Sequence, residues 1–237
     1  MIIRSSSEKS ARIQESLKRL KKTFPQAKCA LLHRNVYELF VAVQLSAQCT
    51  DERVNQISPA LFQKVPDFSA LASISQEELE QLIYSTGFYR NKAKNLRGAA
   101  QHILKRFSGK IPHSLAEMIT LPGIARKSAN VILETAFGIV EGIVVDTHVK
   151  RITKLLRITE SDNAERIERE LMEYIPRKKW GDVGHLLVAL GRAICIAHRP
   201  QCHLCPLADI CPSSQAGVIS SRKAQKAPRK NLRELEK

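Results

Sequence analysis

Aromatic side chains, glycine and proline are scarce in this sequence, and it has no long uninterrupted apolar run. Aromatic residues make up 5% of the 237 positions, and glycine and proline occur ten times each. This low content of glycine and proline excludes collagen-like and low-complexity chains. The apolar stretch 121–145 is interrupted by four charged side chains, so it does not supply the roughly 20 apolar residues of a membrane-spanning helix. The first residues, MIIRSSS, lack the apolar core of a secretory signal. We therefore expect a cytoplasmic or otherwise intracellular protein without a membrane span.

Acidic residues are few relative to basic ones. The chain holds 38 lysines and arginines against 23 aspartates and glutamates, a net charge of +15. Residues 214–237 contain seven of the basic and two of the acidic residues, so the rest of the chain still has an excess of ten positive charges. This excess predicts a polyanionic partner, either nucleic acid or an acidic membrane surface, although it also serves solubility. The composition of 214–237 predicts a disordered basic tail.

The alternating pattern of β-strands is nearly absent, and helical periodicity dominates instead. The one β-like run, 143–145, is too short to predict a strand. Apolar residues recur with a 3.6-residue period, which predicts helices, in the segments 36–47, 96–107, 129–137 and 183–194. The sequence therefore predicts an all-α protein.

Local signals mark where several helices begin and end. The capping-box pattern, which satisfies free backbone N–H groups of a first turn, occurs at Ser75–Glu78 and at Ser114–Glu117. Gly87 and Gly138 stand where helices are expected to end. Residues 8–22 predict a further, basic amphipathic helix.

The six cysteines need an explanation other than disulfides, which are rare in a reducing compartment. Four of them occur within seventeen residues, spaced C-x6-C-x2-C-x5-C, at Cys195, Cys202, Cys205 and Cys211. Thiolates this close together predict one metal centre. Zinc sites usually contain two C-x2-C pairs, whereas this segment has one, and an iron–sulfur cluster held by four cysteines also fits. The spacing leaves both open. We expect Cys29 and Cys49 to be small buried side chains.

Residues 121–125 predict a tight turn between two helices. The proline–glycine pair forces the chain to turn within the segment Leu121, Pro122, Gly123, Ile124 and Ala125. The helix that follows begins near Ala125 or Arg126, and its first backbone N–H groups have no acceptor within the helix. With the positive end of the helix dipole they form a phosphate site. Such a site binds nucleic acid without reading its sequence; a plain helical hairpin is the alternative.

Two residues after the turn are candidates for chemistry. Lys127 lies in the first turn of the second helix, where the helix dipole and the adjacent Arg126 favour its neutral amine. A neutral amine can form a Schiff base; contact with a phosphate is the alternative role. Asp146 follows nineteen residues later, before a new amphipathic run, and is a candidate N-cap. A carboxylate fixed in this way can also stabilise positive charge on a sugar or assist proton transfer. We interpret His148 as structural.

Taken together, these motifs resemble those of the helix-hairpin-helix DNA glycosylases, most closely the endonuclease III branch. The matching segments run from about residue 29 to residue 211. They are LSAQCTD, GFYRNKA, LPGIARKSANV and VDTH, which begin at Leu45, Gly87, Leu121 and Val145, followed by the four-cysteine loop. Their order and the cysteine spacing are highly specific in combination, whereas no single segment is. One departure is Ala125, where many members have a second glycine.

The resemblance implies two helical domains with DNA lying across the groove between them. A six-helix domain with the hairpin would span 29–139, and a second domain would combine 1–28 with 140–213, leaving 214–237 as the tail. The four cysteines of the second domain would hold a [4Fe–4S] cluster. The resemblance further implies a monomer whose partner is damaged double-stranded DNA and not a membrane.

For activity, the resemblance implies a bifunctional DNA glycosylase and apurinic/apyrimidinic lyase that removes oxidised pyrimidines in base excision repair. Lys127 matches the lysine that attacks C1′ of a flipped-out nucleotide, and Asp146 matches the essential aspartate. The resulting Schiff base permits β-elimination of the 3′ phosphate. The alternatives are a related glycosylase for mismatched or other bases, and a non-catalytic iron–sulfur DNA-binding protein. The adenine-specific branch is disfavoured because it generally lacks lysine at the position of Lys127.

Further positions carry over as candidate DNA contacts besides residues 121–126. Gln48 matches a residue that fills the hole left by the flipped base, and Phe88 stands where the family places an apolar wedge. An ordinary polar helix end and a core phenylalanine are the alternatives. His198 and Arg199, between the first two cysteine ligands, either contact phosphate or offset the charge of the cluster.

Overall fold

The computed structural model describes residues 5–215, and this part of the chain is helical without strands. The all-α prediction is therefore confirmed, and residues 143–145 belong to an extended connection. Among the described residues, no helix is both long and apolar enough to span a bilayer. The predicted basic tail, 214–237, lies outside the described residues except for its first two positions.

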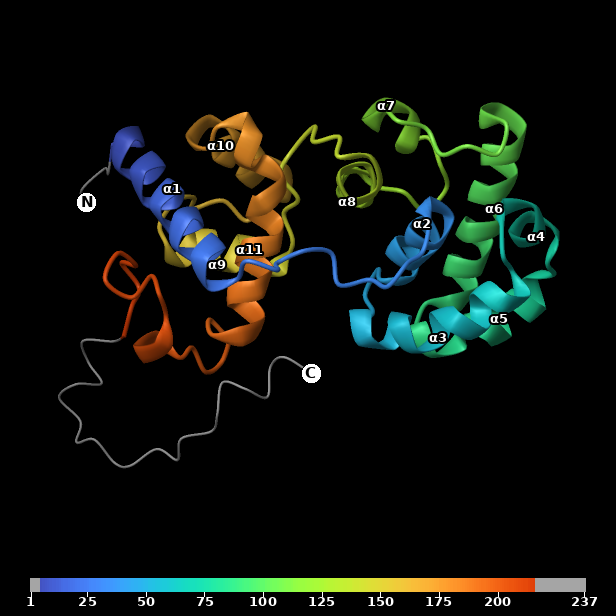
Figure 1. The fold of residues 1–237 in the computed structure, drawn as a ribbon, viewed down its shortest axis with the longest axis horizontal. Coiled ribbons are helices and arrows are strands. Elements are labelled where there is room, and N and C mark those ends of the chain that lie inside the picture. The colour runs from blue at the N-terminus through green and yellow to red at the C-terminus, as the bar shows by residue number, and fades with distance from the viewer. Residues whose placement is uncertain (1–4, 216–237) are drawn as a thin grey trace.

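One half of the molecule packs helices α2–α8 around a single apolar core (Figure 1). Its elements are α2 (Val36–Leu45), α3 (Asp51–Lys64), α4 (Phe68–Ser73), α5 (Gln76–Ile83), the 3-10 turn η1 (Tyr84–Thr86), α6 (Tyr89–Phe107), α7 (Leu115–Met118) and α8 (Arg126–Phe137). Helix α2 is buried on all sides from Tyr37 to Leu45. Its sequence, VYELFVAVQL, is apolar all round, which is typical of a central helix.

The other half combines the N-terminal helix with the C-terminal part of the chain (Figure 1). Its elements are α1 (Ser6–Thr23), α9 (Thr147–Leu155), α10 (Ala164–Tyr174), η2 (Arg177–Lys179), α11 (Trp180–Ala193) and η3 (Cys202–Leu204). The apolar face of α1, formed by Ile13, Leu17 and Leu20, is buried in a second core with residues from 143–207. Helix α1 packs against α10 and α11.

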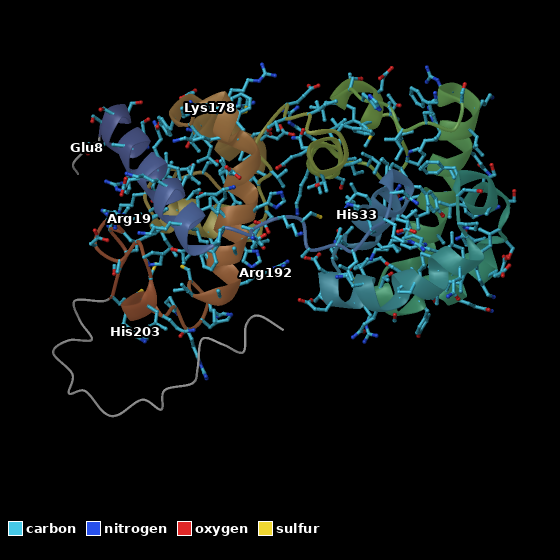
Figure 2. All side chains as sticks on the ribbon, in the orientation of Figure 1. Glu8, Arg19, His33, Lys178, Arg192 and His203 are labelled. Carbon is cyan, nitrogen blue, oxygen red and sulfur yellow. The ribbon has the colours of Figure 1, made fainter. Side chains whose placement is uncertain are left out.

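The two halves are joined by two crossings of the chain and by ion pairs. The segments 24–35 and 138–146 connect them (Figure 1). Figure 2 shows Arg192 at the side of α11 that faces the other half. Among residues 5–215, helices of the two cores are linked by the ion pairs Arg126–Glu168 at 2.9 Å and Arg192–Asp51 at 2.7 Å, and by a contact of His185 Nε2 with the Glu134 carboxylate at 3.3 Å. Polar contacts therefore fix how the hairpin half sits against the half that contains the cysteines.

The predicted helix boundaries are found in the structure. Ser75 Oγ accepts the Glu78 N–H at 3.1 Å, and Ser114 Oγ accepts the Glu117 N–H at 3.3 Å. Gly138 ends α8 with a φ of +65°, in the left-handed region where glycine is favoured. The sequence signals for helix ends were thus sufficient at these positions.

Candidate active site

The turn between α7 and α8 is held against two other helices by a glycine. Leu121 and Ile124 are buried, and Gly123 has a φ of +77°. A Cβ at position 123 would lie 2.7 Å from Gln44 Oε1 of α2 and 2.8 Å from Asn95 Cβ of α6. Both the backbone conformation and the lack of space therefore require glycine here. Packing against α2 and α6 fixes the direction in which α8 begins.

Ala125 begins α8 without strain. Its φ is −92° in an extended conformation, and it is the N-cap of α8 without a side-chain hydrogen bond. A second glycine is therefore not needed at this position in this chain. Because no side chain caps the helix, the first N–H groups of α8 are left for a ligand or for water.

The guanidinium of Arg126 faces the other half of the molecule. It donates to both carboxylate oxygens of Glu168 on α10, at 2.9 and 3.1 Å. Glu168 is buried, with an exposed side-chain fraction of 8%, and the pair raises the pKa of Arg126. The side chain of Arg126 thus positions α8 relative to α10, and the backbone N–H is the part of this residue that faces the open helix end. Sequence reasoning missed Glu168, because nothing local links two residues 42 positions apart.

Lys127 and Asp146 come together although they belong to different helices. Lys127 is exposed in the first turn of α8, and Asp146 caps α9 at the end of the segment that crosses between the halves. The two are close enough for the charge of Lys127 to lower the pKa of the Asp146 carboxyl. The structure therefore places an accessible amine within electrostatic range of a fixed carboxylate.

Asp146 is held by three hydrogen bonds. Its Oδ1 accepts the backbone N–H groups of His148 and Val149, both at 2.9 Å, and its Oδ2 lies 3.0 Å from His148 Nδ1. Burial raises the pKa of Asp146, but the bonds from Val149 and His148 and the charges of His148 and Lys127 outweigh it, so the pKa lies below its ordinary value. The N-cap prediction is confirmed. His148, which the sequence suggested was only structural, contacts the carboxylate directly; its place two residues after a capping aspartate was the available signal.

Gln48 and Phe88 are both exposed and both have left-handed backbones. Their φ values are 52° and 48°, and 64% of Phe88 is exposed. The alternative of a core phenylalanine is therefore wrong. A left-handed non-glycine residue costs roughly 1–2 kcal/mol, and such residues cluster at functional sites.

The four predicted metal-ligating cysteines line one cavity of about 390 Å³, together with His198 and Arg151. All four are half-buried free thiols. Burial raises the pKa of Cys195, Cys205 and Cys211, and neighbouring thiols raise it further. Within residues 5–215, no three His, Cys, Asp or Glu side chains converge on a position for a single metal ion. His198 and Arg199 are exposed on the same loop.

Arg151 of α9 supports this loop and was not predicted from the sequence. Its Nη2 donates to the carbonyl of Cys195 at 2.7 Å, and its charge opposes the rise in the pKa of that thiol. An arginine on a helix five residues after the capping Asp146 carries no local sign of such a role.

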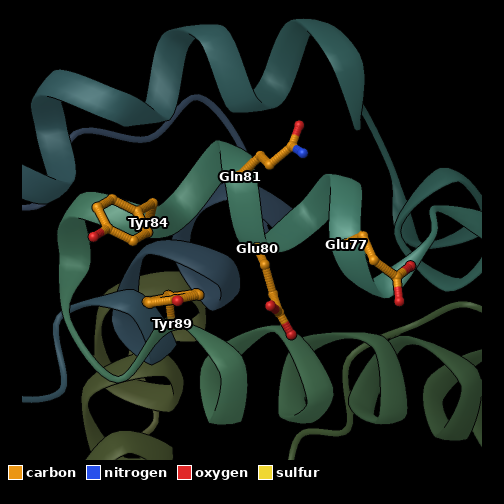
Figure 3. A pocket seen from close by; sticks show the side chains of 5 residues that line it. All are labelled: Glu77, Glu80, Gln81, Tyr84 and Tyr89. Atoms are coloured by element: carbon orange, nitrogen blue, oxygen red, sulfur yellow. The ribbon is translucent and has the colours of Figure 1, made fainter.

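Gly87 and Phe88 connect η1 to α6 and are called the Phe88 loop. A second cavity of about 440 Å³ lies beside this loop and is lined by Glu77, Glu80, Gln81, Tyr84 and Tyr89 (Figure 3). Tyr84 and Tyr89 contact each other, with ring centroids 4.8 Å apart. The two tyrosines flank Gly87 and Phe88 in the chain, so their contact closes the base of that loop.

The fold and the hairpin define a class of protein. Residues 41–177 match the family described as HhH-GPD superfamily base excision DNA repair protein. The endonuclease III of Synechocystis sp. is 49% identical over 215 residues, covering 91% of this chain and 98% of the relative. That of Bacillus subtilis is 42% identical over 204 residues, covering 86% and 93%. A solved structure of a trapped endonuclease III–DNA covalent intermediate, an estranged-adenine complex, is 40% identical with a TM-score of 0.84, covering 88% of this chain and 98% of that one. The chain therefore belongs to the endonuclease III family.

Proposed function

We propose that this protein is a DNA glycosylase of base excision repair that removes oxidised pyrimidines and cleaves at the resulting abasic site through a lysine Schiff base. The observation that carries the proposal is the approach of the exposed Lys127 to the hydrogen-bonded Asp146. The covalent endonuclease III–DNA intermediate solved for the similar protein supports it.

The chemistry follows from these two side chains. The neutral amine of Lys127 attacks C1′ of a flipped-out nucleotide, so that a C–N bond to lysine forms and the glycosidic bond breaks, with its electron pair leaving on the base. The attacking nitrogen passes a proton to the departing base. The C1′–O4′ bond then breaks, O4′ takes a proton from water, and a protonated imine forms between Lys127 and C1′. A C2′ proton is lost to water, and the C3′–O bond breaks with its electron pair leaving on the 3′ phosphate. Because its pKa is lowered, Asp146 is ionised at neutral pH and best suited to stabilising positive charge on the sugar.

We infer that DNA binds across both halves. The two buried cores support a division into 29–139 and 1–28 with 140–213 as domains. The uncapped N–H groups of α8 would hold a phosphate near the turn 121–126. His198 and Arg199 would contact phosphates from the cysteine loop, and Gln48 and Phe88 would enter the duplex. We propose that the protein acts as a monomer on damaged duplex DNA inside the cell.

The donor set of the cysteine cavity fits an iron–sulfur cluster. The four thiols that line this cavity, at Cys195, Cys202, Cys205 and Cys211, would be its ligands. When bound, a [4Fe–4S] cluster would tie the ends of this loop together and fix the side chains between them. Iron and sulfide analysis with a visible spectrum tests this proposal. A brown protein with broad visible absorbance is expected, whereas a colourless protein with stoichiometric zinc would overturn it.

Borohydride trapping tests the activity. Wild-type protein is incubated with duplex DNA that contains thymine glycol or an abasic site, and the imine is then reduced. We expect a covalent adduct with wild type and with Lys94→Ala, which changes an exposed lysine of α6, but not with Lys127→Ala. The absence of both adduct and strand cleavage with wild type would refute the proposal, and DNA binding without either would favour the non-catalytic alternative.

A further inference from the structure

A buried lysine joins the Phe88 loop to the Gln48 loop, which is the connection 46–50 between α2 and α3. Lys92 lies in α6 with 6% of its surface exposed. Its Nζ donates to the carbonyl of Leu45 and to the carbonyl of Thr86, each at 2.8 Å. One ammonium group therefore binds two backbone segments that are otherwise separated by α3, α4 and α5.

The two carbonyls lie at the points where these loops begin. Leu45 is the last residue of α2, three positions before Gln48, and Thr86 is the last residue of η1, two positions before Phe88. Carbonyls at helix C-terminal ends lack N–H donors within the helix and favour a cation. Lys92 is thus hydrogen-bonded to the residue that precedes each loop, whereas the exposed Gln48 and Phe88 lie further along the loops.

Packing alone does not require a lysine at this position. Burial lowers the pKa of Lys92, because a charged ammonium loses hydration inside the protein. A methionine of similar length would fill the space without that cost. What the lysine adds is a pair of hydrogen bonds to two backbone segments at once.

The Phe88 loop is also restrained at its outer side. The rings of Tyr84 and Tyr89 meet across its base (Figure 3), and the Arg90 guanidinium lies 5.1 Å from the Tyr89 ring centroid. Lys92 and the tyrosine pair therefore both contact the chain next to Phe88, which has a left-handed, exposed conformation. The Gln48 loop shares the Lys92 contact.

We propose that Lys92 is a positioning residue that sets the separation of Gln48 and Phe88, so that both side chains enter the DNA duplex together when a base is flipped out. The inference rests on the proposed function, since it assigns Lys92 a part in opening the duplex. The proposal predicts that only the reaction on duplex DNA depends on Lys92. DNA that is already single-stranded needs neither a wedge nor a side chain that fills the hole left by the base.

The test compares two substrates in single-turnover reactions. Lys92→Met is assayed on thymine glycol in duplex DNA and on an abasic site in a single-stranded oligonucleotide, with Lys94→Met as the control on an exposed position of the same helix. We expect Lys92→Met to slow duplex excision by about 10- to 100-fold, the range that misplacement of aligned groups produces. Single-strand cleavage by the same variant, and both rates of Lys94→Met, should stay within about twofold of wild type.

A double-mutant cycle separates positioning from a general loss of structure. In this cycle, Lys92→Met is combined with Gln48→Ala and Phe88→Ala. If Lys92 acts through these two side chains, the combined variant slows duplex excision by a smaller factor than the product of the factors for the separate variants. The proposal is overturned if the factor for the combined variant equals that product, or if Lys92→Met slows the reaction equally on both substrates. Should Lys92→Met not fold, Lys92→Gln, which keeps a donor on a shorter side chain, is measured with the same two substrates. A wild-type protein inactive on both substrates refutes the proposed function, whereas an active wild type with an unaffected Lys92→Met refutes only the role of Lys92.

Discussion

Asp146 combines a structural and a chemical role, and two substitutions separate them. Asparagine caps a helix about as well as aspartate, whereas alanine costs about 1 kcal/mol of stability. The amide oxygen of Asp146→Asn can still accept the His148 and Val149 N–H groups that bond Oδ1 at 2.9 Å. We therefore expect Asp146→Asn to retain the melting temperature of wild type within about 1–2 °C and Asp146→Ala to lower it by about 2–4 °C.

Activity should respond differently. Both variants remove the negative charge beside Lys127, so both should slow base excision by about 100-fold or more. Single-turnover excision and thermal unfolding on the same preparations give the comparison. If Asp146→Asn were as active as wild type, or lost as much stability as Asp146→Ala, the assignment of two separate roles would be wrong.

The pH dependence of stability provides an independent check of the same carboxylate. Its pKa in the folded protein lies below the ordinary value of 3.8. Ionised Asp146 therefore contributes stability that is present above the ordinary value and is lost as the pH falls through the lowered one. The difference in melting temperature between wild type and Asp146→Asn should therefore change as the pH falls below about 4. A difference that stays the same through this acidic range would contradict the lowered pKa.

Three further predictions concern the hairpin, the contact between the halves and the tail. Gly123→Ala should destabilise the fold by at least about 1–2 kcal/mol, since its φ of +77° is left-handed, and should weaken DNA binding; unchanged unfolding in denaturant would contradict the packing described. Arg126→Met, which leaves the buried Glu168 without its partner, should cost about 1–3 kcal/mol and more than Glu168→Gln, which leaves the half-exposed arginine to solvent; the reverse order in thermal unfolding would refute this. Deleting 214–237 should weaken DNA binding mainly at low salt and reduce the salt dependence, because seven cations are removed, and an equal slope for the two proteins would argue against a role for the tail.

Sequence patterns were sufficient for helices and caps because these depend on neighbours within one or two turns. The serines at 75 and 114, the glycine at 138 and the capping Asp146 all act as their local context predicts. Helix α2 was more buried than a single apolar face suggests, because the whole helix is apolar and lies at the centre of its half. The predicted apolar face also extended to Ala47, which is exposed beyond the end of α2 at Leu45.

Contacts between distant segments were beyond sequence reasoning. The left-handed conformations of Gln48 and Phe88 are imposed by the segments around them, since neither residue type favours them. The partner of Arg126 is 42 positions away, and the carbonyls bound by Lys92 belong to two different segments. The approach of Lys127 to Asp146 depends on how the segment 138–146 crosses between the halves.

The pairing of α1 with α10 and α11 has a consequence for how the chain is made. Helix α1 ends at Thr23, but its partners begin at Ala164 and Trp180, so about 140 residues separate them. During synthesis, the segment 31–133 is complete and can bury its own core first. The apolar face of α1 is covered only after α10 and α11 have been synthesised. Helix α1 is thus translated about 140 residues before the helices that bury it, and chains interrupted before α11 expose Ile13, Leu17 and Leu20 as an apolar surface that quality control can recognise.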